Sequence, residues 1–166
     1  GAISGSLTEI RMYRQMSREQ LHLTVAAIVC FEQKFLLVEE VDKLTGQRVL
    51  NQPAGHVEQD EDLLSAVKRE LHEETGLLLE PNSWLGISQL KAANGHRYVR
   101  LNFIFEPDTL PSHYQPQDSD ILALHWYSSH QLSESVLPLR SQLVADAIAA
   151  YCQGVRIPLT LIQPTR

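Results

Sequence analysis

The chain has 166 residues, which is enough for one domain with a hydrophobic core of its own. Its composition is 43% hydrophobic and 20% charged, as is ordinary for a globular protein, and its formal net charge is −6. That charge argues against sequence-independent binding to nucleic acid or to an anionic membrane, because both need a basic surface.

The opening residues, GAISGSLTEI, are typical of a cleavage remnant or a loose leader, so we place residues 1–20 outside the fold. A single domain is expected over 21–160, with an irregular tail at 161–166. We find no secretory signal and no run of ~18 apolar residues, and therefore expect a cytoplasmic protein without a membrane span. Cys30 and Cys152 are expected to be buried free thiols, which fits a reducing compartment.

Apolar and β-branched segments alternate with polar loops along the rest of the chain. They predict strands over 21–31, 35–40, 47–52, 84–92, 96–107 and 121–127, with an extended segment at 77–80. Pro53 and Gly55 are expected to end the third strand. Helices are predicted over 60–75 and 141–154, the first with Asp60 as N-cap and Gly76 as its stop. Strands interleaved with two helices indicate an α/β fold with a mixed sheet.

One segment, GHVEQDEDLLSAVKRELHEETGL, carries regularly spaced charged residues and glycines. Its fixed positions are Gly55, Glu61, Arg69, Glu70, Leu71, Glu73, Glu74, Gly76 and Leu77. This pattern matches the Nudix box at every position, so the chain resembles the Nudix hydrolase family. Seven charged or glycine positions at these spacings would arise by chance about once in 10⁸ windows.

The three glutamates near the end of the first predicted helix share one strip of its surface. Glu74 lies about 40° from Glu70, and Glu73 lies about 60° to the other side. Each like-charge pair costs roughly 0.2–0.5 kcal/mol of helix stability. Mg²⁺ binds carboxylate oxygens, so a bound Mg²⁺ would turn this repulsion into stabilisation. The alternative is a solvated charged face. Arg69 is expected to orient Glu73, whereas Glu61 reaches the site only if the helix begins late, and otherwise caps it.

Further ligands are implied by the family resemblance. Ala54 stands where the family commonly has glycine, and its backbone carbonyl is expected to bind the metal. An acidic residue in the loop before Trp126 serves in many relatives as metal ligand or general base. Asp120 matches that position best and Asp118 second, with an Asx turn or a strand cap as the alternative.

The resemblance also implies the Nudix fold, a mixed β-sheet sandwiched between helices (α/β/α). The implied reaction is attack of water on phosphorus, assisted by Mg²⁺ with Mn²⁺ as a substitute. Glu70 is our first choice as general base and Asp120 its competitor. NQPAGH and the second predicted helix resemble a subgroup of bacterial Nudix phosphatases more narrowly. That subgroup releases orthophosphate from nucleoside tri- and diphosphates and acts on the hydroxymethylpyrimidine diphosphate precursor of thiamine.

Several arginines are candidates to bind substrate phosphates, although each could equally be a surface residue. They are Arg48, Arg97 and Arg100, the last on one predicted strand face with Tyr98 and Asn102. Three other functions stay open: hydrolysis of a dinucleotide polyphosphate or nucleotide sugar, nucleotide sensing without hydrolysis, and hydrolysis of RNA 5′ ends, which the negative charge disfavours. We expect a small-molecule substrate, no nucleic acid and no membrane partner, and a monomer or homodimer.

Overall fold

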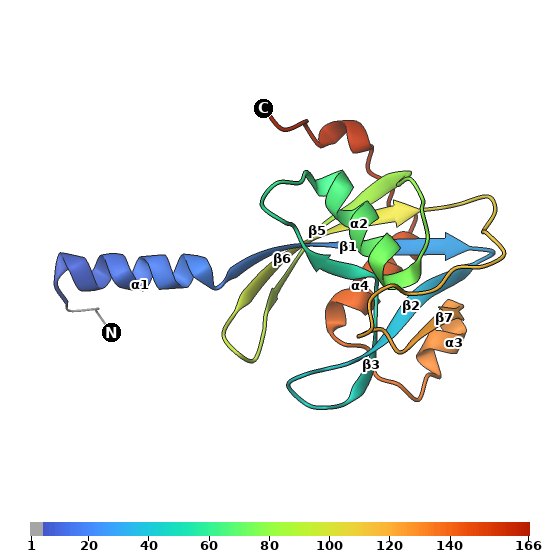
Figure 1. The fold of residues 1–166 in the computed structure, drawn as a ribbon, viewed down its shortest axis with the longest axis horizontal. Coiled ribbons are helices and arrows are strands. Elements are labelled where there is room, and N and C mark those ends of the chain that lie inside the picture. The colour runs from blue at the N-terminus through green and yellow to red at the C-terminus, as the bar shows by residue number, and fades with distance from the viewer. Residues whose placement is uncertain (1–4) are drawn as a thin grey trace.

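A computed structural model describes residues 5–166, with only the backbone described for residues 16–19. The elements follow one another as α1 (Leu7–Glu19), β1 (Leu21–Phe31), β2 (Lys34–Val41), β3 (Arg48–Asn51), β4 (Ala54–His56), α2 (Leu63–Thr75), β5 (Ser83–Lys91), β6 (Arg97–Phe105), β7 (Ala123–Tyr127), α3 (Ser129–Ser133), α4 (Gln142–Cys152) and the 3₁₀ turn η1 (Leu159–Leu161). Figure 1 shows their arrangement. None of the helices in these residues is long and apolar enough to cross a membrane.

The sheet is mixed, as predicted. β1 and β6 run parallel and stay in register from Leu21 opposite Arg97 to Val29 opposite Phe105. The remaining pairs are antiparallel: β5 with β6, β4 with β1, and β1, β3 and β7 each with β2. β1 turns into β2 through Glu32 and Gln33, whose φ angles of 50° and 65° suit a tight hairpin.

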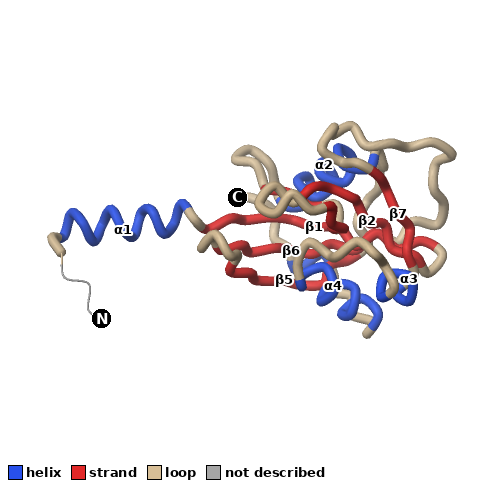
Figure 2. Tube along the Cα trace, turned by 90° about the horizontal axis from the view of Figure 1, so that it is seen from below, coloured by secondary structure: helices blue, strands red, loops and turns tan. Residues whose placement is uncertain are grey.

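Helices cover both faces of this sheet, which confirms the predicted α/β/α layers (Figure 2). On one face, α2 buries Ala66, Val67 and Leu71 against the apolar side chains of β1 and β6. On the other face, α4 buries Val144 and Ile148 against a second apolar cluster, next to α3. Because α2 is fixed by its apolar stripe, its opposite, charged strip is free to build a site.

Helix α2 begins three residues later than predicted. Its N-cap is Asp62, which accepts a hydrogen bond from the Ser65 N–H at 2.8 Å, so the prediction of Asp60 was wrong. The physical reason is that Glu61 pairs with Arg69 and thereby stays outside the helix. The predicted stop is confirmed, since Gly76 adopts the left-handed conformation with φ 82°.

The strand prediction failed at two places. Pro53 interrupts the chain as expected, but Ala54–His56 resume extended pairing with β1 as β4, because Pro53 lies between strands and removes no bond from either ladder. The predicted extended segment at 77–80 forms no strand. It therefore serves as a connection from α2 to β5.

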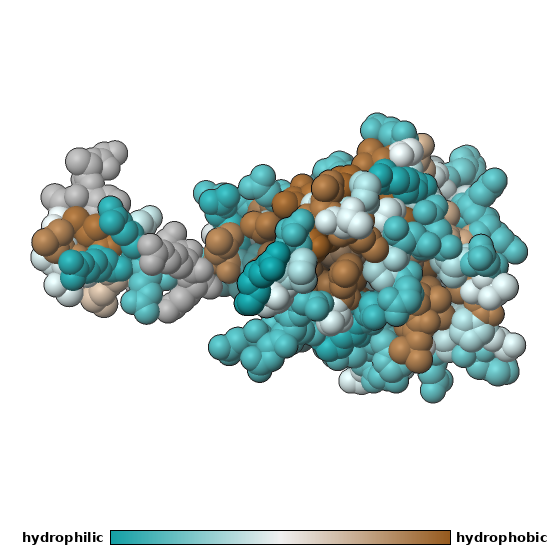
Figure 3. Space-filling view, turned by 90° about the horizontal axis from the view of Figure 1, so that it is seen from above, coloured by the Kyte–Doolittle hydropathy of each residue, from teal (hydrophilic) through white to brown (hydrophobic). Residues whose placement is uncertain are grey.

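The segment that we placed outside the fold contains the helix α1, and this helix projects from the body of the domain (Figure 3). Its Leu7, Met12 and Tyr13 are exposed, so none of these three apolar side chains joins the core. The two cysteines are free, as expected, but the expectation of burial was wrong. Cys30 is only half-buried and Cys152 is exposed.

Candidate active site

Arg69 is the hub of the charged strip on α2. Its guanidinium donates two hydrogen bonds to Glu61, from Nε at 2.9 Å and from Nη2 at 2.6 Å. Nη1 donates to Glu70 at 2.9 Å and to Glu73 at 3.2 Å. Nη2 also donates to the backbone carbonyl of His56 at 3.0 Å. The expected contact with Glu73 is therefore present, but the shortest contacts go to Glu61.

These contacts set the charge states around Arg69. The hydrogen bonds that Arg69 donates to Glu61 raise the pKa of Arg69 and lower the pKa of Glu61. Glu61 thus reaches the site through Arg69, because the late start of α2 leaves it in the loop ahead of the helix. Its carboxylate also accepts from the Glu58 N–H at 2.8 Å.

Glu70 lies against β4. A Cβ at Gly55 would overlap the Glu70 carboxylate, so only glycine allows this approach. The Glu70 side chain is 12% exposed. Burial raises the pKa of Glu70, while the hydrogen bond from Arg69 opposes the rise. A carboxylate with a raised pKa is a better proton acceptor than an exposed one.

Glu74 is the most deeply buried of the three glutamates, at 7% exposure. Its Oε1 accepts a hydrogen bond from the Ala54 N–H at 2.8 Å. Burial raises the pKa of Glu74 to about 9, and Glu40, Glu70 and Asp118 add to the rise by charge repulsion. A cation that binds beside a buried carboxylate surrounded by others gains the most favourable electrostatic energy.

Glu74 opens into an acidic cleft of about 530 Å³. The cleft lies between the end of α2, β2 and the loop ahead of β7, and is lined by Glu40, Val41, Lys43, Glu74, Asp118, Ser119, Asp120, Leu122 and Arg140. The loop is fixed to the helix end, because the Gln117 and Asp118 N–H groups donate to the Glu73 carbonyl at 2.8 and 3.0 Å. Both candidate aspartates therefore reach the site.

The two aspartates differ in their surroundings. Asp118 stands next to Glu74 and accepts a hydrogen bond from the Asp120 N–H at 2.9 Å, as in an Asx turn. Asp120 is 69% exposed and lies 3.7 Å from Lys43. Asp118 is thus the aspartate whose charge acts on the buried Glu74 carboxylate, whereas Asp120 pairs with Lys43.

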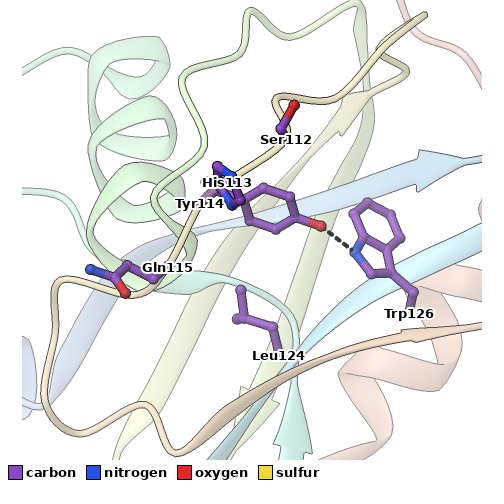
Figure 4. A pocket seen from close by; sticks show the side chains of 6 residues that line it. All are labelled: Ser112, His113, Tyr114, Gln115, Leu124 and Trp126. Carbon is purple, nitrogen blue, oxygen red and sulfur yellow. Dashed lines mark hydrogen bonds between the residues drawn. The ribbon is translucent and has the colours of Figure 1, made fainter.

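A second hollow of about 690 Å³ lies on the other side of this loop (Figure 4). It is lined by Ser112, His113, Tyr114, Gln115, Leu124 and Trp126. The Trp126 Nε1 donates to the Tyr114 hydroxyl at 2.8 Å and closes one wall. This hollow holds no carboxylate, so the smaller, acidic cleft is the candidate for metal-assisted chemistry.

This geometry accords with a comparison of the sequence with known families. The NUDIX domain model matches residues 20–148. The chain belongs to the Nudix family. Phosphatase NudJ of Escherichia coli strain K12 is 42% identical over 142 residues, which is 85% of this chain and 90% of that protein. The narrower resemblance seen in the sequence is therefore confirmed.

Solved structures give the same result. The NUDIX hydrolase from Nitrosomonas europaea is 34% identical, with a TM-score of 0.79 over 87% of this chain and 97% of that one. The NUDIX domain of Shewanella oneidensis NrtR, complexed with ADP ribose, is 21% identical with a TM-score of 0.63 over 80% and 87%, and shows the fold alone. Together with the family match, these relatives make the chain a Nudix hydrolase acting on phosphoric anhydrides.

The candidate substrate residues of this Nudix hydrolase lie in different places. Arg100 is buried beneath the site and donates to Gln52 at 3.0 Å and Asn51 at 3.3 Å. Burial lowers its pKa to about 10. The Arg100 Nε and the Oδ1 of the neighbouring Asn102 have no hydrogen-bond partner among the described residues. Such unpaired buried atoms need an explanation, and a ligand or water would supply one.

The other candidates lie away from the cleft. Tyr98 stacks on His22, with ring centroids 4.6 Å apart, at the far end of β6. Arg48 is 65% exposed and pairs with Glu39, which points to the opposite face of β2 from Glu40. Arg97 is exposed at the start of β6. A role of these residues in substrate binding stays a prediction.

The donor set of this site fits a hard cation. Glu70, Glu73 and Glu74 offer carboxylate oxygens and Ala54 a backbone carbonyl, which are the ligands that Mg²⁺ prefers. Ala54 avoids the left-handed region, as that use of its carbonyl requires. Within residues 5–166, no three acidic, histidine or cysteine side chains are already arranged so that together they could hold a metal ion. Here Arg69 holds Glu70 and Glu73, so cation binding requires these carboxylates to exchange partners.

Glu40 and Arg140 are among the cleft residues that were not predicted from the sequence. Glu40 appeared to be an ordinary polar position of a strand, and Arg140 lies in a loop with no motif. Glu40 accepts hydrogen bonds from Asn51 at 2.9 Å and from Arg140 at 2.8 Å. The residue types alone gave no signal, since only the tertiary fold brings β2 next to the end of α2.

Proposed function

We propose that this Nudix hydrolase is a Mg²⁺-dependent phosphatase. Its substrates on this proposal are nucleoside tri- and diphosphates and the hydroxymethylpyrimidine diphosphate precursor of thiamine. The observation that carries the proposal is Glu74, buried and repelled by Glu40, Glu70 and Asp118 at the mouth of an acidic cleft. The identity to a protein named Phosphatase NudJ supports the choice of reaction.

The proposal assigns each residue a task. Glu70, Glu73, Glu74 and the Ala54 carbonyl would hold Mg²⁺, or Mn²⁺ in its place. When bound, the metal neutralises phosphate charge and lowers the pKa of a coordinated water. On this proposal Glu70 is also the base that accepts the proton from the attacking water, and Asp120 is the competing base.

The surrounding residues position these groups. Arg69 orients Glu70 and Glu73, and Glu61 fixes Arg69 in turn. Arg100 and Asn102 support the floor of the site from β6, with Gln52 and Asn51 as hydrogen-bond partners of Arg100. The exposed, acidic cleft suits a small substrate that binds together with its metal. On this proposal the protein acts as a monomer or homodimer in the cytoplasm.

The test is a screen for orthophosphate release across nucleotides and pyrimidine diphosphates, with Mg²⁺ and with a chelator. Release of orthophosphate that depends on Mg²⁺ is the expected result. Release of two nucleoside monophosphates from a dinucleotide polyphosphate, without orthophosphate, would instead support the pyrophosphohydrolase alternative. Glu73→Gln is expected to lower turnover, because it removes a metal ligand while it keeps the shape of the side chain.

A further inference from the structure

The acidic cleft needs positive charge to admit an anionic substrate, and the protein can add to the charge that a bound cation supplies. Glu40, Glu74, Asp118 and Asp120 all line it. Charges of one sign in a cleft of low dielectric repel a phosphate strongly unless cations offset them. Among the residues that line the cleft, two are cationic, Lys43 and Arg140.

These two cations differ in how firmly they are held. Lys43 is 85% exposed and lies 3.7 Å from the exposed Asp120, and a surface pair of this kind contributes little. Arg140 is 41% exposed, and its Nη1 donates to Oε1 of Glu40 at 2.8 Å, where Glu40 is only 14% exposed. The Arg140 guanidinium is thus held through its Nη1, while the side chain stays partly accessible to a ligand.

The backbone also fixes Arg140 at the wall of the cleft. Its N–H donates to the Leu50 carbonyl at 2.8 Å, and the Leu50 N–H donates to the Pro138 carbonyl at 2.9 Å. The loop at Leu139 therefore lies beside β3 like a short parallel strand. The Nδ2 of Asn51, the next residue along β3, donates to the same Oε1 of Glu40 at 2.9 Å.

We propose that Arg140 binds the terminal phosphoryl group of the substrate and that Glu40 is its positioning residue. A guanidinium carries five N–H donors in a planar fork that matches two phosphate oxygens. Glu40 takes one of them, and the remaining donors make no hydrogen bond within residues 5–166. The inference rests on the proposed function, because a phosphatase must hold the phosphoryl group that it transfers to water.

The test is calorimetric binding of inorganic phosphate to the full chain in the presence of Mg²⁺. Arg140→Gln is expected to weaken phosphate binding at least about tenfold, and Arg140→Lys by less, because lysine keeps the charge without the fork. Arg14→Gln on α1 is the matched control, since it removes the same charge from an exposed helix away from the cleft. It should leave phosphate affinity unchanged.

Glu40→Gln distinguishes phosphate binding by Arg140 from a role in which Arg140 only neutralises the charge of Glu40. If Arg140 only neutralises Glu40, the double variant Glu40→Gln/Arg140→Gln, which keeps the net charge of the cleft, will bind phosphate as tightly as wild type, and the inference is overturned. If Glu40 positions a phosphate-binding arginine, Glu40→Gln will weaken phosphate binding less than Arg140→Gln does. Absence of phosphate binding by the wild type at millimolar concentration also overturns it.

Two further readouts keep the outcome clear. If a thermal melt shows that Arg140→Gln does not fold, Arg140→Lys and Glu40→Gln are compared with wild type instead. Unchanged phosphate affinity in both of these variants overturns the inference. The phosphate affinities are measured without turnover. A wild type that releases no orthophosphate from any substrate would therefore contradict the proposed function, while the comparison of phosphate affinities would still decide the role of Arg140.

Discussion

Arg69 binds Glu61 through two hydrogen bonds, 2.9 Å from Nε and 2.6 Å from Nη2, and so ties the loop before α2 to the middle of the helix. The same guanidinium donates to Glu70 and Glu73. The like-charge crowding on α2 is thereby offset within the protein. Glu61 belongs to the site because it fixes the residue that holds two candidate metal ligands.

Glu61→Gln should lower activity without unfolding the protein. Glutamine keeps the shape of the side chain but loses the charge that fixes Arg69. We expect a roughly 10- to 100-fold loss in kcat/KM or in the Mg²⁺ activation constant, as for other residues that support metal ligands. Steady-state kinetics at several Mg²⁺ concentrations measure both. Glu58→Gln, exposed in the same loop, is the control, and a Glu61→Gln enzyme with the wild-type rate would contradict the prediction.

Gly55→Ala should destabilise the protein and abolish activity. The new methyl group would overlap the Glu70 carboxylate, and overpacking of this kind typically costs about 1–3 kcal/mol. Urea denaturation of both single variants and the double variant checks the cause. In a Glu70→Ala background the methyl group has room, so Gly55→Ala should then cost little. An equal cost in both backgrounds would show that the backbone, and not Glu70, requires glycine.

Asp62→Ala should weaken α2, whereas Asp60→Ala should not. Loss of an N-cap costs about 1 kcal/mol, and the hydrogen bond from the Ser65 N–H lowers the pKa of Asp62. The stabilisation is therefore complete above the usual pKa of 3.8 and is lost as the pH falls through the lower, folded-state value. Denaturation at neutral and acidic pH should show the difference from wild type shrinking in acid. A larger effect of Asp60→Ala would contradict this assignment.

Glu74 should make the protein less stable at high pH when metal is chelated. Burial raises its pKa to about 9, against a usual value of 4.5. Between these values the folded protein holds a proton that the unfolded chain releases, so stability falls as pH rises through this window. Thermal melts with a chelator should show a shallower fall for Glu74→Gln than for wild type. Glu80→Gln, an exposed control, should keep the wild-type slope, and identical slopes in all three would refute the prediction.

The sequence predicts the core of this fold well because its patterns are local. β-branched runs and the ANG turn locate β1, β5 and β6, and the spacing from Gly55 to Leu77 locates the site helix. The helix start was missed because Asp60, Glu61 and Asp62 stand in a row and each could cap it. Only the tertiary pairing of Glu61 with Arg69 selects Asp62.

The rest of the site depends on contacts between distant segments. Glu40 lies 34 residues before Glu74 in the numbering, and Arg140 lies in a loop that reaches the cleft only by pairing with β3. Neither position has a periodicity or a spacing that distinguishes it from a solvated polar residue. α1 was missed because residues 1–20 were set aside as a leader, and its Leu7, Met12 and Tyr13 are all exposed and do not join the core.

The central claim is that the α2 carboxylates bind a divalent cation on which hydrolysis depends. A calorimetric Mg²⁺ titration of wild type, Glu70→Gln and the control Glu80→Gln tests it most directly. Wild type and Glu80→Gln should bind Mg²⁺, with affinity at least about tenfold weaker in Glu70→Gln. Equal Mg²⁺ affinity in all three proteins, or no binding by the wild type, would contradict it.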